Sequence, residues 1–279
     1  MCGRCLRTGC AGKEPGGRKE GKPPPERRRK RGAAHMEQTM LRIEENRPLT
    51  RDILKIRLTG DVSGVERPGQ FVNIRLEGLF LRRPISVFDR EKDAITLIYR
   101  TVGEGTRRLS RMKAGETLDV LTGLGNGYDL TRAGDRPLLL GGGAGVPPLY
   151  WLARMLREQG KRVTAVLGFN SAEDVFAEED FRKLGCETIV TTADGSHGIR
   201  GFVTDAMPEE YSYFYACGPE PMMRAVDRIA KTDGEFSLEE RMGCGFGACM
   251  GCSCRTRDGM KRICREGPVL RRGEILWEK

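Results

Sequence analysis

The sequence has no long hydrophobic run. No stretch of about 18 apolar residues, the length that a membrane-spanning helix needs, occurs in the chain, so we expect no membrane partner. The amino-terminal residues also lack the apolar core of a secretory signal peptide. Ten cysteines without such a signal argue against a disulfide framework and predict a reducing compartment, the cytoplasm.

Histidine and apolar residues are scarce as well. His35 and His197 are the only histidines, and they form no evident catalytic pair, so the sequence predicts no catalytic residue acting as a general acid or base. The hydrophobic share of 38% is low for a compact globular protein, which indicates that some of the length is not folded.

Positive charge gathers at one end of the chain. Residues 1–35 contain eleven Lys or Arg and three Glu, a net charge of +8, whereas the whole chain carries +9. Residues 36–279 are therefore close to neutral, which argues against a nucleic-acid-binding face. Frequent Pro and Gly and the basic run 27–31 predict that residues 1–35 are a disordered basic extension or tag. The CxxC of Cys2 and Cys5, with Cys10 nearby, is interpreted as incidental.

The remaining sequence divides into three parts, and its predicted class is α+β, multidomain. Residues 36–133 show short alternating apolar runs between turns, a pattern typical of an antiparallel β-barrel. Residues 134–234 alternate strand and helix patterns, which predicts an α/β domain with a parallel sheet covered on both faces. Residues 235–279 are rich in Gly and Cys and too short for a large core, so we expect a small subdomain held by a metal centre.

Half of the cysteines lie between residues 244 and 264. Four of them follow the pattern C-x4-C-x2-C-x11-C: Cys244, Cys249, Cys252 and Cys264. The first three match the spacing of plant-type [2Fe–2S] sites, whose fourth ligand comes from a later segment. The interleaved glycines permit a tight loop whose N–H groups can point at cluster sulfurs. A zinc site is the alternative, although zinc favours paired C-x2-C knuckles. Cys254 is surplus; it is interpreted as a buried thiol and is the one rival ligand.

A second set of motifs suits a flavin dinucleotide. In the run Arg82–Ser86, a guanidinium suits an anionic pyrophosphate and a hydroxyl suits a flavin edge. Downstream, Ile98–Arg100 closes a strand, and Gly103–Thr106 is expected to open a helix whose amino end could hold a phosphate. Each motif alone is weak, and their order and separation support the prediction.

A glycine-rich loop at residues 141–148 follows an apolar run and precedes a helical pattern. It contains GxGxxP, in which Gly143 and Gly145 would let the backbone approach a pyrophosphate, and proline is well tolerated in a first helical turn. A structural glycine turn is the alternative.

The next strand-to-helix crossing begins at Cys217 with the sequence Cys-Gly-Pro-Glu-Pro-Met. A nicotinamide would lie here in a doubly wound sheet, and the alternative for Cys217 is a small core residue. The strand end at residues 168–171 has no Arg or Lys to meet a 2′-phosphate, which favours NAD over NADP.

From Met36 to Lys279 these motifs resemble the ferredoxin reductase superfamily, because RPxS, GxGxxP and CGPxPM occur in its order. The run 240–270 is similar to the electron-transfer subunits of class 1B dihydroorotate dehydrogenases. The resemblance implies three cofactors: FAD on the barrel, NAD(H) on the α/β domain and a [2Fe–2S] cluster on Cys244, Cys249, Cys252 and Cys264. It implies FAD contacts at Arg83, Pro84, Ile85, Ser86, Ile98, Tyr99, Arg100, Gly105 and Thr106. The gap between Cys252 and Cys264 is shorter than in some relatives. The shorter gap implies a shorter surface hairpin and leaves the number of ligands unchanged.

The resemblance also implies a partner and a reaction. Electrons would pass between NAD(H) and an FMN-containing catalytic subunit that oxidises dihydroorotate to orotate in pyrimidine biosynthesis, in a heterotetramer of two subunits of each kind. One alternative is a related subunit of a ferredoxin:NADP oxidoreductase, sulfite reductase or hydrogenase complex. The other is a zinc-bearing interaction protein whose glycine loops hold no nucleotide.

Overall fold

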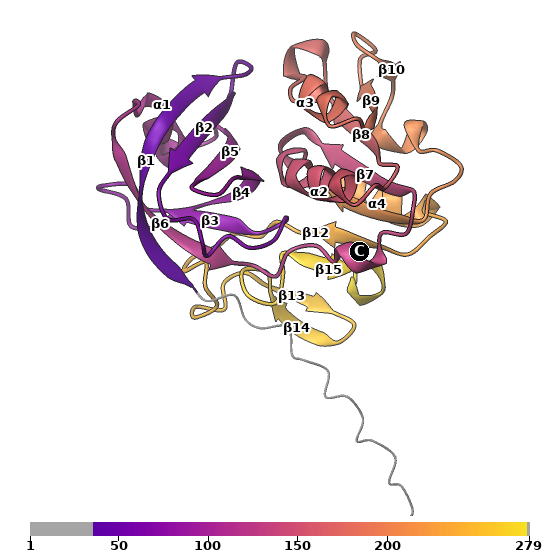
Figure 1. The fold of residues 1–279 in the computed structure, drawn as a ribbon. Coiled ribbons are helices and arrows are strands. Elements are labelled where there is room, and N and C mark those ends of the chain that lie inside the picture. Colours follow the sequence, from indigo (N-terminus) through magenta and orange to yellow (C-terminus); the bar gives the residue numbers. More distant parts are fainter. Residues whose placement is uncertain (1–35, 278–279) are drawn as a thin grey trace, which may run out of the picture. The chain divides into compact units, whose positions relative to one another are not determined.

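Six antiparallel strands close into a barrel in the first part of the chain (Figure 1). The structure is a computed structural model, and it describes residues 36–277. The strand order is β1-β2-β5-β4-β3-β6, and the alternating burial of Ile53–Thr59 shows one face inward and one face outward. The predicted antiparallel barrel is confirmed. Its strands are β1 (Glu37–Pro48), β2 (Ile53–Thr59), β3 (Phe71–Ile74), β4 (Arg83–Arg90), β5 (Ala94–Arg100) and β6 (Thr117–Leu124).

One short helix, α1 (Glu104–Arg111), packs onto this barrel. Its Leu109 is fully buried in the barrel core. The Asn46 amide on β1 donates to the carbonyls of Leu109 (2.9 Å) and Met112 (3.0 Å), so it satisfies acceptors that the end of the helix leaves open. The amino end of α1 faces away from this anchor and remains available for other contacts.

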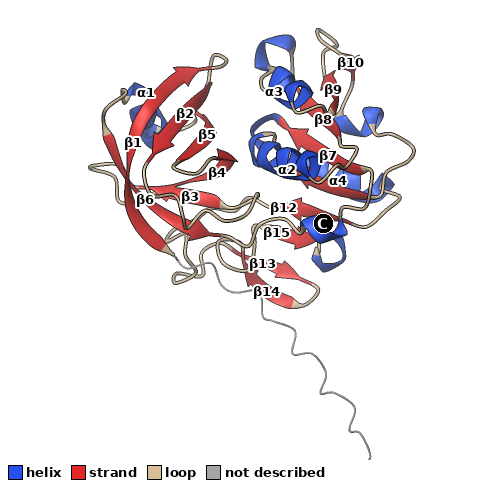
Figure 2. Cartoon of the chain, in the orientation of Figure 1, coloured by secondary structure: helices blue, strands red, loops and turns tan. Residues whose placement is uncertain are grey.

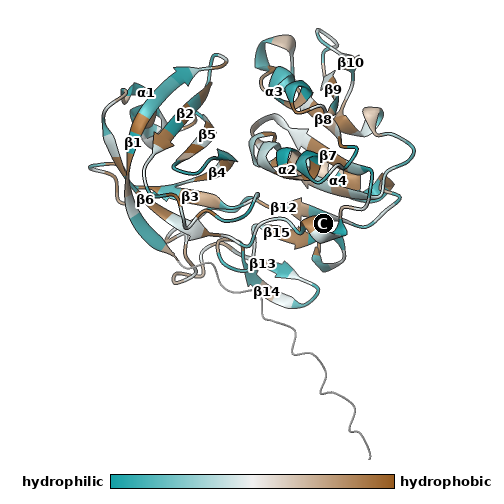
Figure 3. Ribbon diagram, in the orientation of Figure 1, coloured by the Kyte–Doolittle hydropathy of each residue, from teal (hydrophilic) through white to brown (hydrophobic). Residues whose placement is uncertain are grey.

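The second part of the chain forms a seven-stranded sheet in the order β10-β9-β8-β7-β11-β12-β15. All neighbours are parallel except β15, which runs antiparallel to β12. The central strands β7 and β8 are strongly hydrophobic (Figure 3), as strands buried on both faces require. Their bounds are β7 (Pro137–Gly142), β8 (Thr164–Phe169), β9 (Glu187–Thr192), β10 (Ile199–Arg200), β11 (Tyr213–Cys217), β12 (Gly234–Ser237) and β15 (Val269–Arg271).

Helices cover both faces of this sheet (Figure 2). The helices α2 (Pro147–Glu158) and α3 (Glu178–Lys183) share one hydrophobic cluster with one face, and α4 (Glu220–Ile229) belongs to the cluster on the other. The predicted parallel sheet with helices on both faces is confirmed. None of the helices among residues 36–277 has the length and apolar character to span a membrane. Short 3₁₀ turns lie at Leu130–Arg132, Gly143–Gly145, Ala172–Asp174, Val203–Ala206 and Arg272–Glu274.

Strand β4 of the barrel packs directly against α2. Phe88 and Tyr150 stack with ring centroids 4.2 Å apart and planes 8° from parallel. Beside them, the Arg154 guanidinium donates to the Asp89 carboxylate (3.0 Å) and to the Arg90 carbonyl (2.7 Å). This contact fixes the barrel against the helix that follows the glycine-rich loop.

The cysteine-rich segment leaves the sheet and returns to it. After β12 the chain forms the cysteine loop and the hairpin of β13 (Ser253–Thr256) and β14 (Gly259–Arg262), and then pairs with β12 as β15. The boundary that we expected between residues 234 and 235 therefore falls inside β12, whose Phe236 is fully buried in the sheet. The prediction for residues 1–35 lies outside the described residues.

Candidate functional site

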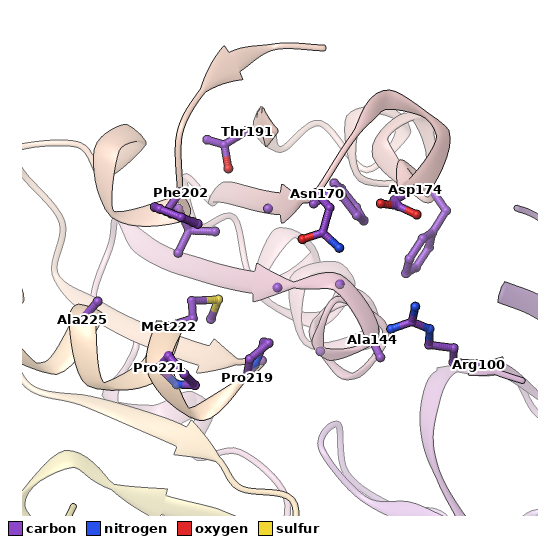
Figure 4. A pocket seen from close by; sticks show the side chains of 18 of the residues that line it. Arg100, Ala144, Asn170, Asp174, Thr191, Phe202, Pro219, Pro221, Met222 and Ala225 are labelled. Atoms are coloured by element: carbon purple, nitrogen blue, oxygen red, sulfur yellow. The ribbon is translucent and has the colours of Figure 1, made fainter. Parts of the chain in front are cut away.

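A cavity of about 530 Å³ lies at the carboxyl ends of β7, β8 and β11 (Figure 4). Open parallel sheets bind their ligands at this edge. The view shows Arg100 and Asp174 on one side of the cavity and Phe202, Met222 and Ala225 on the other. Arg100 comes from the barrel strand β5, so the two parts of the chain share the cavity wall.

The glycine-rich loop forms the floor of this cavity. Gly143 has φ +50°, and a Cβ there would meet no atom of the described chain within 4 Å, so its backbone is open to the cavity. A Cβ at Gly145 would lie 2.3 Å from the Cys217 carbonyl oxygen, so only glycine fits. Helix α2 then begins at Pro147, with its amino end at the cavity. The structure brings Gly143 and Gly145 together in a place suited to a pyrophosphate.

Cys217 lies beneath the cavity. Its side chain is 2% exposed and belongs to the core cluster, whereas the next residue, Gly218, lines the cavity. Burial, aided by the nearby Glu239 carboxylate, raises the pKa of the Cys217 thiol well above its usual value, so the thiol is neutral. Its carbonyl contacts Gly145, and a role beside a nicotinamide stays a prediction.

Sequence reasoning missed several polar residues of the cavity, among them Thr191, Asp174 and Glu239. Thr191 is fully buried, and its hydroxyl has no hydrogen-bond partner among the described residues. Such an orphaned group fits a cavity that receives a polar ligand. Asp174 and Glu239 also line the cavity. Asp174 follows the end of β8, a position at which an acidic residue could have been noted. No local pattern marks the other two.

The residues predicted to hold a flavin pyrophosphate meet at the amino end of α1. A Cβ at Gly105 would lie 2.0 Å from the Arg83 Nε, so the guanidinium crosses the first helical turn against bare backbone. Gly103, the N-cap, has no side chain to cap the first N–H groups. The Thr106 hydroxyl instead accepts from the N–H groups of Val102 (3.0 Å) and Gly103 (3.3 Å). This glycine cradle beside a guanidinium fits a phosphate.

The other predicted flavin residues lie on two neighbouring strands. Ser86 is half-buried on β4, with Pro84 exposed and Ile85 buried beside it. On β5, Ile98 packs against the cluster of the second sheet, and Arg100 pairs with Asp52 (2.5 Å) at the cavity.

Tyr99 faces the other way from these two residues. Its side chain packs in the barrel core, where the hydroxyl donates to Asn46 (3.0 Å) and burial raises the tyrosine pKa to about 12. Only the backbone of Tyr99 could therefore contact a flavin on the side of Ile98 and Arg100.

The four predicted cluster ligands lie in two pairs. The N–H groups of Cys244 and Cys249 each donate to the other's sulfur at 3.4 Å, and the N–H of Cys264 donates to the Cys252 sulfur at 3.4 Å. Further N–H groups point at the first pair, from Ala248 (3.2 Å) and Gly251 (3.5 Å). Backbone donors of this kind stabilise thiolate charge, as the glycine-rich loop predicted.

The pKa values of these thiols follow from the same contacts. Burial raises the pKa of Cys244, but the N–H groups of the loop outweigh it and lower the value to about 6. Burial and the neighbouring Cys252 raise the pKa of Cys264 to about 12, so this thiol is protonated near neutral pH and would lose its proton on coordinating a metal ion.

The paired contacts fit the iron–sulfur reading. A [2Fe–2S] cluster needs two sulfurs for each of two irons, and the N–H to sulfur contacts join Cys244 to Cys249 and Cys252 to Cys264. Cys254 is half-buried on β13, packed against a hydrophobic cluster, and burial raises the pKa of its thiol.

Comparisons with known proteins agree with this geometry. Residues 239–276 match the family model described as the iron–sulfur cluster binding domain of dihydroorotate dehydrogenase B, and residues 139–228 match an oxidoreductase NAD-binding domain. The dihydroorotate dehydrogenase B (NAD(+)) electron transfer subunit of Shouchella clausii (strain KSM-K16) is 45% identical over 255 residues, which cover 86% of this chain and 98% of that protein. The chain belongs to this family.

Other members and one solved structure extend the likeness. The dihydroorotate dehydrogenase B electron transfer subunit of Geobacillus sp. (strain WCH70) is 44% identical to this chain, and the aligned region covers 86% of this chain and 99% of that protein. A solved structure of the NADH-dependent reduced ferredoxin-NADP oxidoreductase, described in work on flavin-based electron bifurcation, is 32% identical with a TM-score of 0.78. It covers 86% of this chain and 90% of that one. The predicted family and fold class are therefore confirmed. The individual cofactor residues stay predictions that fit the geometry.

Proposed function

We propose that this chain carries electrons between NAD(H) and a partner subunit through FAD and a [2Fe–2S] cluster. The observation that supports this best is the shared wall of the cavity. The barrel residues Asp52, Ile53 and Arg100 line the same space as the glycine loop 142–145. A flavin held by the barrel and a nicotinamide held by the sheet would therefore face each other, as hydride transfer requires.

Each group has its own residues in this proposal. Arg83 and the amino end of α1 would bind the FAD pyrophosphate, and Ser86 would meet the flavin edge. Gly143, Gly145 and the amino end of α2 would bind the NAD(H) pyrophosphate. When bound, FAD supplies the conversion between the two-electron chemistry of NADH and the one-electron chemistry of an iron–sulfur cluster. The cluster would be held by the thiolates of Cys244, Cys249, Cys252 and Cys264.

We propose that the partner is an FMN-containing dihydroorotate dehydrogenase catalytic subunit, in a cytoplasmic heterotetramer of two subunits of each kind. The names of the relatives support a dihydroorotate dehydrogenase partner, since they are electron transfer subunits of dihydroorotate dehydrogenase B. The surface near the cluster also suits a partner. Phe246, Met250 and Met260 are exposed on the cysteine loop and its hairpin, and Cys249 is exposed among them. Exposed aromatic and methionine side chains are enriched at protein interfaces.

Anaerobic absorbance during NADH addition tests the proposed function. The reconstituted protein should contain FAD, iron and sulfide, and NADH should bleach the flavin band and then the cluster band. A flavin that stays oxidised would refute the proposal, and a purified protein with zinc and no colour would favour the interaction-protein alternative.

A second candidate is supported by the likeness to the NADH-dependent ferredoxin-NADP oxidoreductase structure, at 32% identity. In that case the chain would serve a different partner with the same cofactors. Co-purification with untagged neighbours separates the two. The proposed function predicts capture of an FMN protein that oxidises dihydroorotate, whereas the second candidate predicts a partner without that activity.

A further inference from the structure

The Asn73 side chain joins the barrel to the cysteine loop. The Asn73 Nδ2 on β3 donates to the Cys244 carbonyl at 3.1 Å, across 171 residues of sequence. In the β3–β4 ladder, Asn73 lies opposite Pro84, and Phe71 lies opposite Ser86. Asn73 therefore lies between the strand predicted to contact the flavin and the first predicted ligand of the cluster.

The loop is shaped to receive this amide. A Cβ at Gly245 would lie 2.3 Å from the Asn73 Nδ2, so the amide rests directly on the backbone of the residue after Cys244. Gly245 has φ +78°, a conformation that favours glycine. On the other side, the N–H of Cys244 donates to the Cys249 sulfur. Both backbone groups of Cys244 are thus held in place, the N–H by the cysteine loop and the carbonyl by the barrel.

The strand that carries Asn73 is itself held in place. The Arg82 guanidinium donates to the Asn73 carbonyl (3.3 Å) and to the Asp119 carboxylate (2.9 Å), which links β3 to β6. Asn73 is therefore held firmly on β3. Arg82, which makes this contact, immediately precedes the predicted flavin contact Arg83 in the sequence.

Folding alone does not account for an asparagine at this position. Asn73 is 1% exposed, and its Oδ1 is buried without a hydrogen-bond partner among the described residues. A buried polar atom left unpaired is costly, and leucine has the same branched shape and number of heavy atoms without that cost. The Nδ2 contact with Cys244 is the interaction that an asparagine provides here and a leucine does not.

We propose that Asn73 is a positioning residue for electron transfer, which fixes the cluster loop on the flavin strands and sets the coupling between FAD and the [2Fe–2S] cluster. The inference rests on the proposed function. In that proposal NADH would supply two electrons as a hydride, and bound FAD would pass them to the cluster one at a time, for onward transfer to the partner. Partners of a ligand's backbone orient the ligand and tune a cluster's potential.

The test compares two variants of Asn73 with matched variants of Asn126. N73L keeps the branched shape and loses the donor, and N73D presents only acceptors to the Cys244 carbonyl. Asn126 also attaches the cysteine-rich segment to the barrel, because its Nδ2 donates to the carbonyls of Glu266 (3.0 Å) and Val269 (2.7 Å), but it contacts no predicted ligand. N126L and N126D therefore remove a comparable anchor.

Anaerobic stopped-flow absorbance after mixing with NADH, with EPR of the reduced protein, gives the readouts. In both Asn73 variants we expect flavin reduction at the wild-type rate, cluster reduction slowed by about tenfold or more, and shifted EPR g-values. Selective loss of iron and sulfide with FAD retained would also support the proposal. In N126L and N126D, thermal stability should fall while the g-values and the flavin-to-cluster rate stay unchanged.

Two results would overturn the inference. One is unchanged cluster reduction and EPR in both Asn73 variants. The other is joint loss of FAD and cluster in both, which would show that Asn73 only supports the core. Failure of the proposed function is a separate outcome, because it would already appear in the wild-type protein as a missing cluster signal.

Discussion

The Arg83 guanidinium occupies the space that a side chain at Gly105 would need. A Cβ at Gly105 would lie 2.0 Å from the Arg83 Nε and 2.7 Å from its Cζ. The helix amino end and the guanidinium therefore act together on whatever anion binds there, and glycine is required for their approach.

The variant G105A tests this arrangement. The new methyl group would push Arg83 away from the first turn of α1, so we expect FAD affinity to fall about tenfold or more, the equivalent of about 1.4 kcal/mol. Equilibrium dialysis or flavin fluorescence measures this. G273A is the control, because a Cβ there also meets no described atom within 4 Å and Gly273 is not among the predicted flavin residues. Equal FAD affinity in G105A and the wild type would contradict the assignment.

The Asp174 carboxylate predicts the choice of nicotinamide dinucleotide. It lines the cavity after β8, where a negative charge would repel a 2′-phosphate and could accept a hydrogen bond from a ribose hydroxyl. We expect D174N to lower the preference for NADH over NADPH, measured as a ratio of kcat/KM values, by about tenfold. Glu173 lies in the same 3₁₀ turn, is exposed and provides the control E173Q. An unchanged ratio in D174N would place the ribose elsewhere.

The ion pair of Arg82 and Asp119 predicts a pH-dependent contribution to stability. Burial raises the pKa of Asp119, but the hydrogen bond and charge of Arg82 outweigh it and hold the pKa below its usual 3.8. A carboxyl whose pKa is lower in the folded state stabilises the protein above the unfolded pKa, and this stabilisation is lost as pH falls through the folded value.

Urea unfolding of D119N measures that contribution. We expect the variant to lose about 1 kcal/mol at pH 7 and to approach the wild type near pH 3. D93N, on the exposed turn before β5, should show little loss at either pH. A loss in D119N that is independent of pH would show that the charge of Asp119 is not involved.

The choice between Cys264 and Cys254 as the fourth cluster ligand can be tested directly. C264S should lose the cluster, because Cys264 is a predicted ligand and its N–H donates to the sulfur of another, Cys252, whereas C254S should keep it, because Cys254 lies outside the pattern C-x4-C-x2-C-x11-C. Iron and sulfide analysis after anaerobic reconstitution decides between them. A C254S protein without the cluster would make Cys254 the fourth ligand.

Local patterns predicted much of the fold. Alternation in Ile53–Thr59 indicated a barrel strand, and the buried spacing of Leu149, Leu152 and Leu156 indicated helix α2. The return of the chain as β15 was not predictable, because Val269–Arg271 is too short to show a period and pairs with a strand far away in sequence.

The site was predictable where it depends on motifs and not where it depends on tertiary contacts. The cysteine spacing and the glycine loops identified residues that the structure brings together. Thr191 and the Asn73–Cys244 contact carry no local signal, since each becomes visible only when distant segments meet. The motif around Cys217 correctly predicted that a strand ends there and a helix follows. The burial of the Cys217 side chain depends on packing beneath the glycine-rich loop, which the motif does not reveal.

EPR of the reconstituted protein after anaerobic reduction with NADH tests the central claim most directly. The account predicts the signal of a reduced binuclear iron–sulfur cluster, appearing only when FAD is bound. A protein that contains FAD and is reduced by NADH but shows no such signal would contradict it.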